Sequence, residues 1–247
     1  MAINKVTEKI RGYPDWHVTS LADYLEWIEI IKKNTRTETL VFRGQQKDWE
    51  LLPSISRNGL PSDILKNEKK LFSRFKREGE PCLHITPNNN WDWLVVAQHH
   101  GLPTRLLDWS YDPLVALWFA LEKCNEADSN PEVWALKPLK EDYIENLDQS
   151  EPFRGTRTKI FETNFSIPRV RAQKGCFVLF NHSHKYPKGF VPLERNEQLR
   201  KRIERVRIAK YANKSILEEI QELGFTKERL YPNIDLVAKK IKESILK

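Results

Sequence analysis

One stretch of this chain is apolar on nearly every side of the helix that it predicts. Residues 113–123 read PLVALWFALEK, and Asp112 followed by Pro113 supplies a capping side chain and a proline at the first helical position. A helix that is hydrophobic all round is buried. Other elements must therefore surround this segment. The 247 residues, of which 40% are apolar, suffice for one large domain that does so.

The rest of the chain alternates helical and strand-like spacing. Helices are predicted from Ser20 to about residue 31 and over 66–78, 91–100, 113–123 and 236–245. Strands are predicted over 39–42, ending at Arg43 and Gly44, and over 105–109, 133–136 and 175–180. Residues 140–169 are polar and weakly periodic, which indicates loops that frame a pocket. We expect one α+β domain over 1–247, with its core from about residue 14, in which helices surround small mixed or antiparallel sheets.

Composition bears on the compartment and the partners. The net charge of +7 favours an anionic partner, although a basic soluble protein needs none. Cys82, Cys124 and Cys176 form no C-x-x-C pair and no even framework, as is usual in a reducing compartment. The sequence contains no apolar signal segment and no run near the roughly 18–20 apolar residues that span a bilayer. We expect a cytoplasmic protein without membrane contact.

Polar and aromatic side chains concentrate within residues 97–122, between two apolar helices. The cluster consists of His99, His100, Thr104, Arg105, Asp108, Trp109, Ser110 and Asp112. Each polar group needs a partner where it is buried, so a chain that only had to fold would hold fewer of them there. A structural role is the alternative, with Arg105 paired to Asp108 and the histidines bonded to carbonyls. We favour a functional site with 104–110 as one wall.

Arg43 and Gly44 form the second candidate feature. An arginine that ends a short strand and precedes a glycine presents a forked cation where the backbone can approach a ligand closely. This arrangement suits a phosphate or a diphosphate. The alternative is a bond from Arg43 to a nearby carboxylate or to a helix C-terminus.

Several common chemistries lack their sequence signatures. His99 and His100 diverge by roughly 100° on a helix and do not share a metal easily, and His182 and His184 lack a third ligand. The chain has no G-x-S-x-G elbow, no phosphate-loop motif and no G-x-G-x-x-G. We therefore expect neither a metal site nor a serine hydrolase.

Residues 195–214 are strongly basic and include Arg195, Arg202 and Arg205. Such a run is typical of a surface that contacts nucleic acid. Interleaved glutamates and the small number of aromatic residues favour a solvated helix face instead.

Two motifs point to a family. VFRGQ at 41–45 and QHHGLPTRLLDWS at 98–110 closely resemble the FRG domain family, named for its Phe-Arg-Gly. QKGCF at 173–177 and Leu-Tyr-Pro at 230–232 fit the same pattern, so the resemblance covers nearly the whole chain. The family occurs mainly in bacteria and their mobile elements, which would suit a toxin or a phage-defence effector.

The order of these motifs is similar, more loosely, to that of ADP-ribosyltransferases. This likeness implies NAD as the substrate and no metal. The binding residues that it implies are Arg43, Gly44, Thr104, Arg105 and Trp109. The catalytic residues that it implies are Arg43, His99, Asp108, Ser110 and Gln173.

Gln173 stands where those enzymes carry a glutamate. A glutamine keeps a hydrogen bond but loses the charge that would stabilise an oxocarbenium-like transition state. Either Asp108, Asp112 or Glu162 replaces that charge, or the protein binds a nucleotide without turning it over. The first hypothesis is an NAD-dependent ADP-ribosyltransferase or NAD hydrolase whose macromolecular target is unknown. The second is a non-catalytic module that binds a nucleotide, a nucleic acid or a protein.

Overall fold

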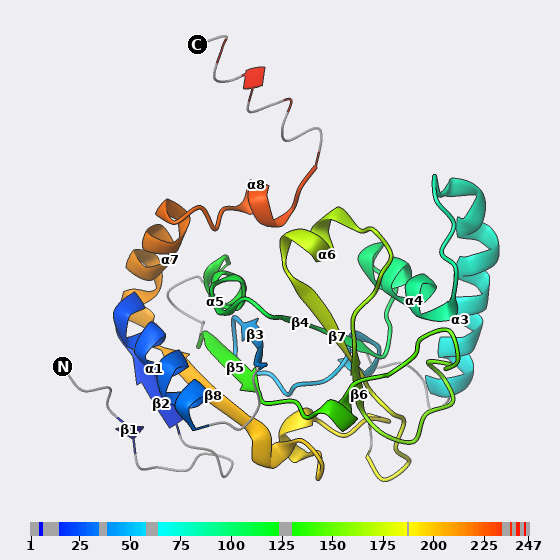
Figure 1. Ribbon diagram of the computed structural model, residues 1–247, viewed down its shortest axis with the longest axis horizontal. Helices are drawn as coiled ribbons and strands as arrows, with labels where there is room; N and C mark the ends of the chain where they lie inside the picture. Colours follow the sequence, from blue (N-terminus) through cyan, green and yellow to red (C-terminus); the bar gives the residue numbers. More distant parts are fainter. Residues whose placement is uncertain are drawn as a thin grey trace.

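A mixed β-sheet runs through the computed structural model of the chain (Figure 1). The structure describes residues 5–6, 15–34, 39–57, 64–123, 130–186 and 188–233, together with 238, 241, 242 and 245. Within these residues the sheet has eight strands in the order β1-β2-β8-β5-β3-β4-β7-β6. The strands are β1 (Lys5–Val6), β2 (Asp15–Val18), β3 (Val41–Gln45), β4 (Leu106–Ser110), β5 (Glu132–Leu136), β6 (Lys159–Phe161), β7 (Gly175–Leu179) and β8 (Ile203–Ile208). β2 pairs with β8 in parallel, and the other neighbours pair antiparallel.

Helices lie along the sheet from end to end. The α-helices of the described segments are α1 (Leu21–Lys33), α2 (Ser54–Arg57), α3 (Ile64–Gly79), α4 (Asn90–His99), α5 (Pro113–Leu121), α6 (Pro168–Ala172), α7 (Asn213–Glu222) and α8 (Lys227–Leu230). α1 and α7 lie at one end, α3 and α4 at the other, and α5 and α6 between them (Figure 1). None of the helices in the described segments is long and apolar enough to span a membrane. The expected α+β class is confirmed, with the strands joined in one sheet.

Caps fix the two helices on either side of β4. The Asn89 side chain accepts hydrogen bonds from the backbone N–H groups of Trp91 and Asp92 at the start of α4, at 3.0 and 2.9 Å. Gly101 takes a φ of 86° just after α4 ends. The Asp112 carboxylate accepts from the backbone N–H of Leu114 at 3.0 Å, and Pro113 follows at the first helical position. The Asp112 cap and Pro113 were predicted from the sequence, and these caps place β4 between two well-defined helices.

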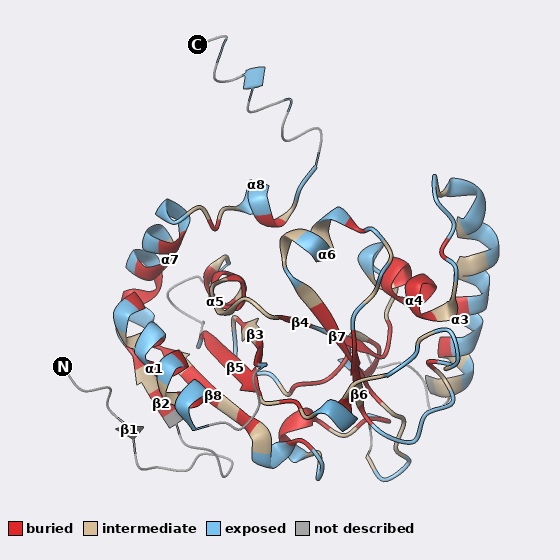
Figure 2. Ribbon diagram, in the orientation of Figure 1, coloured by how far each residue is buried: buried red, intermediate tan, exposed pale blue. Residues whose placement is uncertain are grey.

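α5 is buried as its composition requires. Figure 2 shows this helix and β5 mainly as buried residues. Leu117 and Trp118 are at most 1% exposed, and they pack in one core cluster with Trp27 of α1 and Phe42 of β3. At roughly 2–3 kcal/mol for each large apolar side chain removed from water, this cluster holds α5 firmly against the sheet.

Two expectations about strands are wrong. Arg43 and Gly44 do not end their strand, because β3 continues to Gln45 and pairs with β5 along its whole length. The basic segment does not form a solvated helix face, because residues 203–208 form β8 inside the sheet, between β2 and β5. Arg205 of β8 is only 1% exposed and forms an ion pair with the buried Glu132 at 3.3 Å. Its charge is therefore compensated inside the protein.

Some expectations fall on residues that the structure does not describe. Most of the helix expected over 236–245 lies outside the described residues, and so does Cys124. The other two cysteines carry free thiols, exposed at Cys82 and buried at Cys176.

Candidate functional site

A cavity of about 250 Å³ lies where strands β3 and β4 separate from each other. These strands share a single register pair, Phe42 with Ser110, whereas β3 pairs with β5 at five positions. α5 and α6 close the space beside the strands. The residues that line it are Phe42, Arg43, Gly44, Gln45, Gln46, Trp49, Asp108, Trp109, Ser110, Val115, Ala116, Phe119, Arg169 and Gln173. The cavity thus joins the two features that the sequence singles out, the Phe-Arg-Gly segment and the end of β4.

Arg43 brings a largely unneutralised cation to the cavity. Its Nη1 donates to the backbone carbonyl of Asp108 at 2.6 Å, and its Nε has no partner among the described residues. Burial and the charge of the nearby Arg57 lower the pKa of Arg43 to about 10, although Asp108 opposes the shift. The guanidinium is still charged at neutral pH. A desolvated cation with unused donors is a strong point of attachment for an anion.

Arg169 supplies a second cation. It lies on α6, and the centre of its guanidinium is 4.2 Å from the centroid of the Tyr231 ring. Within the part of the chain that the structure describes, the side chain of Arg169 has neither a hydrogen bond nor an ion pair. All its N–H donors are thus available to a ligand. Arg43 and Arg169 come from different walls, β3 and α6, so an anion between them would be held from two sides.

Asp108 is the one carboxylate among the described residues that line the cavity. The Gln98 amide donates to its Oδ1 at 2.8 Å, and the Thr104 hydroxyl in turn donates to the Gln98 carbonyl oxygen. This chain of hydrogen bonds fixes the direction of the carboxylate. The pKa of His99 is lowered by burial, by His100 and by Arg169, and it is raised by Asp108. His99 therefore lies within electrostatic reach of the cavity although it does not line it.

Aromatic faces complete the lining. Trp49, which is 45% exposed, follows β3, and Phe119 projects from α5. Flat rings of this kind stack on nucleotide bases and on nicotinamide-like rings. With Phe42 and Trp109, the cavity therefore combines two cations, one carboxylate and four aromatic residues.

Ser110 and Gln173 line the cavity, but their polar groups are engaged within the protein. The Ser110 hydroxyl donates to the backbone carbonyl of Gln173 at 2.6 Å and accepts from the backbone N–H of Asp112 at 2.9 Å. The Gln173 side-chain amide donates to the carbonyl of Leu230 at 2.9 Å. These bonds tie β4, α6 and the C-terminal segment together around the cavity.

Thr104 and Arg105 lie outside the cavity. Arg105 is 3% exposed in its side chain and forms a bidentate ion pair with Glu68 of α3, with its Nε 2.8 Å from Oε1. Its guanidinium also lies 4.9 Å from the Phe153 ring centroid. The alternative of a structural ion pair is thus realised for Arg105, with Glu68 as the partner in place of Asp108.

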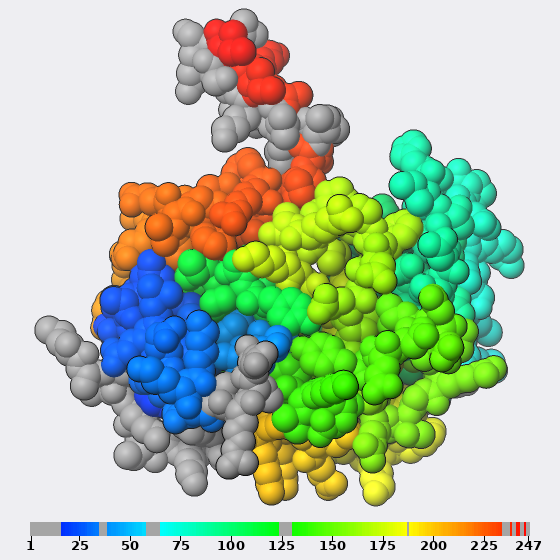
Figure 3. Space-filling view, viewed as in Figure 1, coloured from blue at the N-terminus to red at the C-terminus, as the bar shows by residue number. Residues whose placement is uncertain are grey.

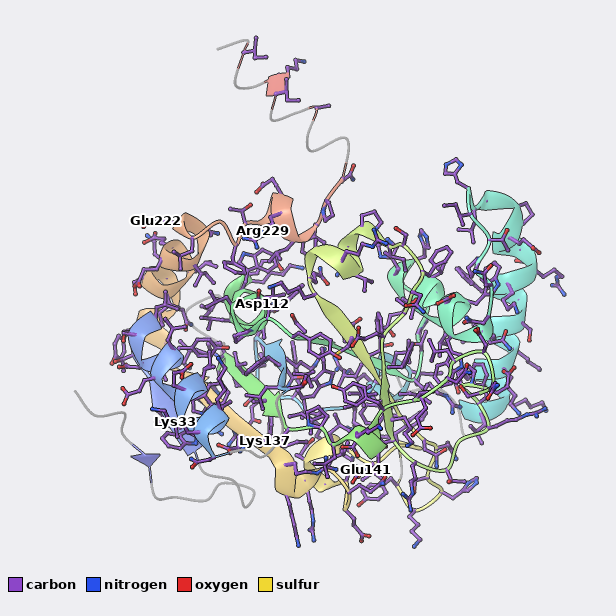
Figure 4. The ribbon with its side chains drawn as sticks, viewed as in Figure 1. Lys33, Asp112, Lys137, Glu141, Glu222 and Arg229 are labelled. Atoms are coloured by element: carbon purple, nitrogen blue, oxygen red, sulfur yellow. The ribbon has the colours of Figure 1, made fainter. Side chains whose placement is uncertain are left out.

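The other two candidate acids also lie outside the cavity lining. Asp112, labelled in Figure 4 at the start of α5, caps that helix and pairs with Lys174 at 3.0 Å. Glu162 accepts a hydrogen bond from the Tyr111 hydroxyl at 2.6 Å. Of the three acids considered from the sequence, Asp108 is the one that lines the cavity. In the described residues, no three His, Cys, Asp or Glu side chains are grouped so that they could hold a metal ion.

Comparison with known families agrees with the motif at the cavity. Residues 38–129 match the family model of the FRG domain. The chain carries an FRG domain. No curated protein and no solved structure matches the chain, so the likeness to ADP-ribosyltransferases stays a prediction.

The FRG domain contributes most of the cavity but not all of it. Arg43, Asp108 and Phe119 lie within the matched range, whereas Arg169 and Gln173 follow it. Sequence reasoning missed Arg169 because it ends the weakly periodic segment 140–169, where no local pattern marks it. It also missed Trp49, Phe119 and Arg57. The exposed tryptophan just after the FRG motif was the one available signal.

The basic residues that follow the FRG domain are largely neutralised. Arg195 pairs with Glu50 at 3.3 Å, and Arg202 pairs with the buried Asp142. Arg205 has almost no exposed surface with which to contact a nucleic acid. Contact with nucleic acid through the more exposed members of this segment stays a prediction.

Proposed function

We propose that the cavity binds a dinucleotide of the NAD type and that Asp108 supports cleavage of its bond between nicotinamide and ribose. The observation that carries this proposal is the pairing of two cations, Arg43 and Arg169, with a single carboxylate in one cavity. Guanidinium groups bind phosphate oxygens through parallel, charge-assisted hydrogen bonds. Trp49 and Phe119 offer faces for the rings of the ligand.

The size of the cavity limits how the ligand enters. Ligand pockets usually enclose about 300–1,000 Å³, and this cavity, at about 250 Å³, is slightly smaller than that range. We therefore expect it to enclose one nucleoside-phosphate half of the dinucleotide. The half with nicotinamide must be the enclosed one, because Asp108 can act only on the ribose that it faces.

The reaction needs a negative charge and no cofactor beyond NAD. The C–N bond to nicotinamide breaks and its electron pair leaves with the nicotinamide nitrogen. Positive charge develops on the ribose, and a carboxylate placed beside it stabilises that charge. An oxygen or nitrogen of the acceptor then bonds to the ribose carbon and releases its proton to solvent. Water as the acceptor makes the protein an NAD hydrolase, and a macromolecule makes it an ADP-ribosyltransferase. Consumption of NAD would suit a toxin or a phage-defence effector.

The test separates binding from turnover. Titration calorimetry with NAD and ADP-ribose measures binding, and chromatography of released nicotinamide measures turnover. Asp108→Asn should keep NAD affinity within about threefold and slow nicotinamide release by about 100-fold or more. Arg43→Gln and Arg169→Gln should each weaken binding by about tenfold or more. Wild-type protein that neither binds nor consumes NAD would exclude the proposal.

Matched controls exist for both kinds of change. Glu162→Gln removes a carboxylate that lies outside the cavity, and it should leave turnover unchanged. Arg229, labelled on α8 in Figure 4, also stacks on an aromatic ring, that of Phe225 at 4.5 Å, but does not line the cavity. Arg229→Gln should therefore leave NAD affinity unchanged.

A second candidate function is a module that binds a nucleotide without chemistry. It is favoured by internal hydrogen bonds, because the Ser110 hydroxyl and the Gln173 amide nitrogen are already bonded within the protein. NAD that binds with micromolar affinity and is recovered intact, with no label transferred to proteins of a lysate, would select this function.

A further inference from the structure

The C-terminal segment 225–231 lies outside the matched FRG range and contacts residues that line the cavity. α8 begins at its Thr226 cap, whose hydroxyl accepts from the backbone N–H of Arg229, and Tyr231 follows the last helical residue. Leu230 is fully buried and anchors the segment. In the space-filling view, the orange-red C-terminal residues lie against the green of α5 and the yellow-green of α6 (Figure 3).

Tyr231 packs against α5 on one side and against Arg169, which lines the cavity, on the other. Its ring packs against Trp118 and Phe119 of α5, with centroids 5.9 and 6.0 Å apart. Arg169 stacks on it, with 4.2 Å between guanidinium and ring centroid. The carbonyl of Leu230 accepts from the Gln173 amide at 2.9 Å. The segment thus contacts both residues that complete the cavity after the FRG domain.

Arg169 depends on this ring for its orientation. Arginine has a long side chain with many rotamers, and the described residues give its guanidinium no hydrogen bond and no ion pair. The face of the tyrosine ring is then the contact that restricts it. A side chain that is already ordered loses less conformational entropy when it binds a ligand.

We infer that Tyr231 is a positioning residue, which holds Arg169 over the cavity for the phosphate groups of the ligand. The C-terminal segment is then a part of the binding site, and the FRG domain alone makes an incomplete one. This inference rests on the proposed function for the identity of the ligand, but not for the stacking of Tyr231 on Arg169.

Binding of ADP-ribose by titration calorimetry tests the inference without any chemical step. Tyr231→Phe keeps the aromatic face and should bind within about twofold of wild type. Tyr231→Leu keeps apolar contact with Trp118 and Phe119 but has no π face, and it should weaken binding about tenfold. In the Arg169→Gln background, Tyr231→Leu should cause no further loss. Tyr211→Leu, a change at a tyrosine that is 80% exposed, is the matched control.

The double variant distinguishes positioning from general damage. A loss on Tyr231→Leu that is equally large in both backgrounds would overturn the inference, and so would wild-type affinity in Tyr231→Leu. Equal melting temperatures for Tyr231→Phe and Tyr231→Leu would establish that both variants are folded.

An NMR measurement keeps the inference testable if no nucleotide binds. A guanidinium stacked on an aromatic ring has a ring-current shift of its Nε–H resonance, and Tyr231→Leu should abolish that shift for Arg169. A shift without any binding of NAD or ADP-ribose would support the positioning and reject the proposed function. An Arg169 resonance that is the same in wild type and Tyr231→Leu would overturn the positioning itself.

Discussion

Gly44 lies directly against the backbone carbonyl of Ala116. A Cβ atom on Gly44 would stand 1.8 Å from that oxygen and 2.7 Å from the backbone nitrogen of Ala120. β3 and α5 therefore approach each other as closely as two backbones can. The glycine of the Phe-Arg-Gly motif is explained by this contact, because it lets the buried helix lie on the strand that carries Arg43.

Gly44→Ala should lower the free energy of unfolding by about 3 kcal/mol or more, since backbone atoms must move to admit the methyl group. Equilibrium denaturation in urea measures the change. Gly155→Ala is the matched control, because a Cβ there would have its nearest neighbour, the carbonyl of Arg157, at 3.9 Å. Equal stabilities for the two variants would contradict this account of the motif.

The buried ion pair of Arg105 and Glu68 leads to a second prediction. Removal of one partner leaves an uncompensated charge, so Arg105→Gln and Glu68→Gln should each lower the free energy of unfolding by about 3–5 kcal/mol. The double change Arg105→Met with Glu68→Leu should restore much of this stability. Thermal and urea unfolding measure both effects. An Arg105→Gln protein of wild-type stability that no longer binds NAD would return Arg105 to a ligand-binding role.

Local patterns predicted the elements around the site because the physical causes of those elements are local. The Asp112 cap, the proline at 113 and the apolar sequence of α5 each act within the helix or within a few residues of its end. The Phe-Arg-Gly motif and Asp108 were likewise visible in the sequence, and both line the cavity. The α+β class follows from the same patterns.

Other features could not be predicted because their partners are distant in the sequence. The alternation in residues 203–208 is that of a strand, but its arginines suggest a solvated surface. Arg205 instead lies beside Glu132, 73 residues away in the sequence. Arg169 stacks on Tyr231, and the Ser110 hydroxyl donates to the carbonyl of Gln173, 63 residues away. The local pattern of a single sequence does not show which of its distant residues come into contact in the fold.

Glu132 leads to a prediction about stability and pH. Burial raises the pKa of its carboxyl group to about 7, although the hydrogen bond from Trp134 and the charge of Arg205 act in the opposite direction. A carboxyl group whose pKa is raised by folding binds protons more readily in the folded state, so its contribution to stability is complete below about pH 4.5 and is lost as the pH rises through 7.

The free energy of unfolding of wild type should therefore fall relative to that of Glu132→Gln between pH 4.5 and 7.5, on the order of 3 kcal/mol. Urea unfolding of both proteins at several pH values measures the difference. Parallel curves for the two proteins would contradict the raised pKa.

His99 links ligand affinity to pH. Its pKa lies below the usual value because of burial and of electrostatic interactions with His100 and Arg169, while Asp108 opposes this. Protonation at lower pH adds a positive charge near Arg169, so ADP-ribose should bind about threefold more tightly at pH 5.5 than at pH 7.5. The diphosphate of ADP-ribose does not titrate in this range, so the change reports on the protein.

His99→Asn should bind ADP-ribose with the same affinity at both pH values. His84→Asn, a change at an exposed histidine, should keep the pH dependence of wild type. An equal dependence in wild type and His99→Asn would remove His99 from the site, and leave Arg43 and Arg169 as its cations.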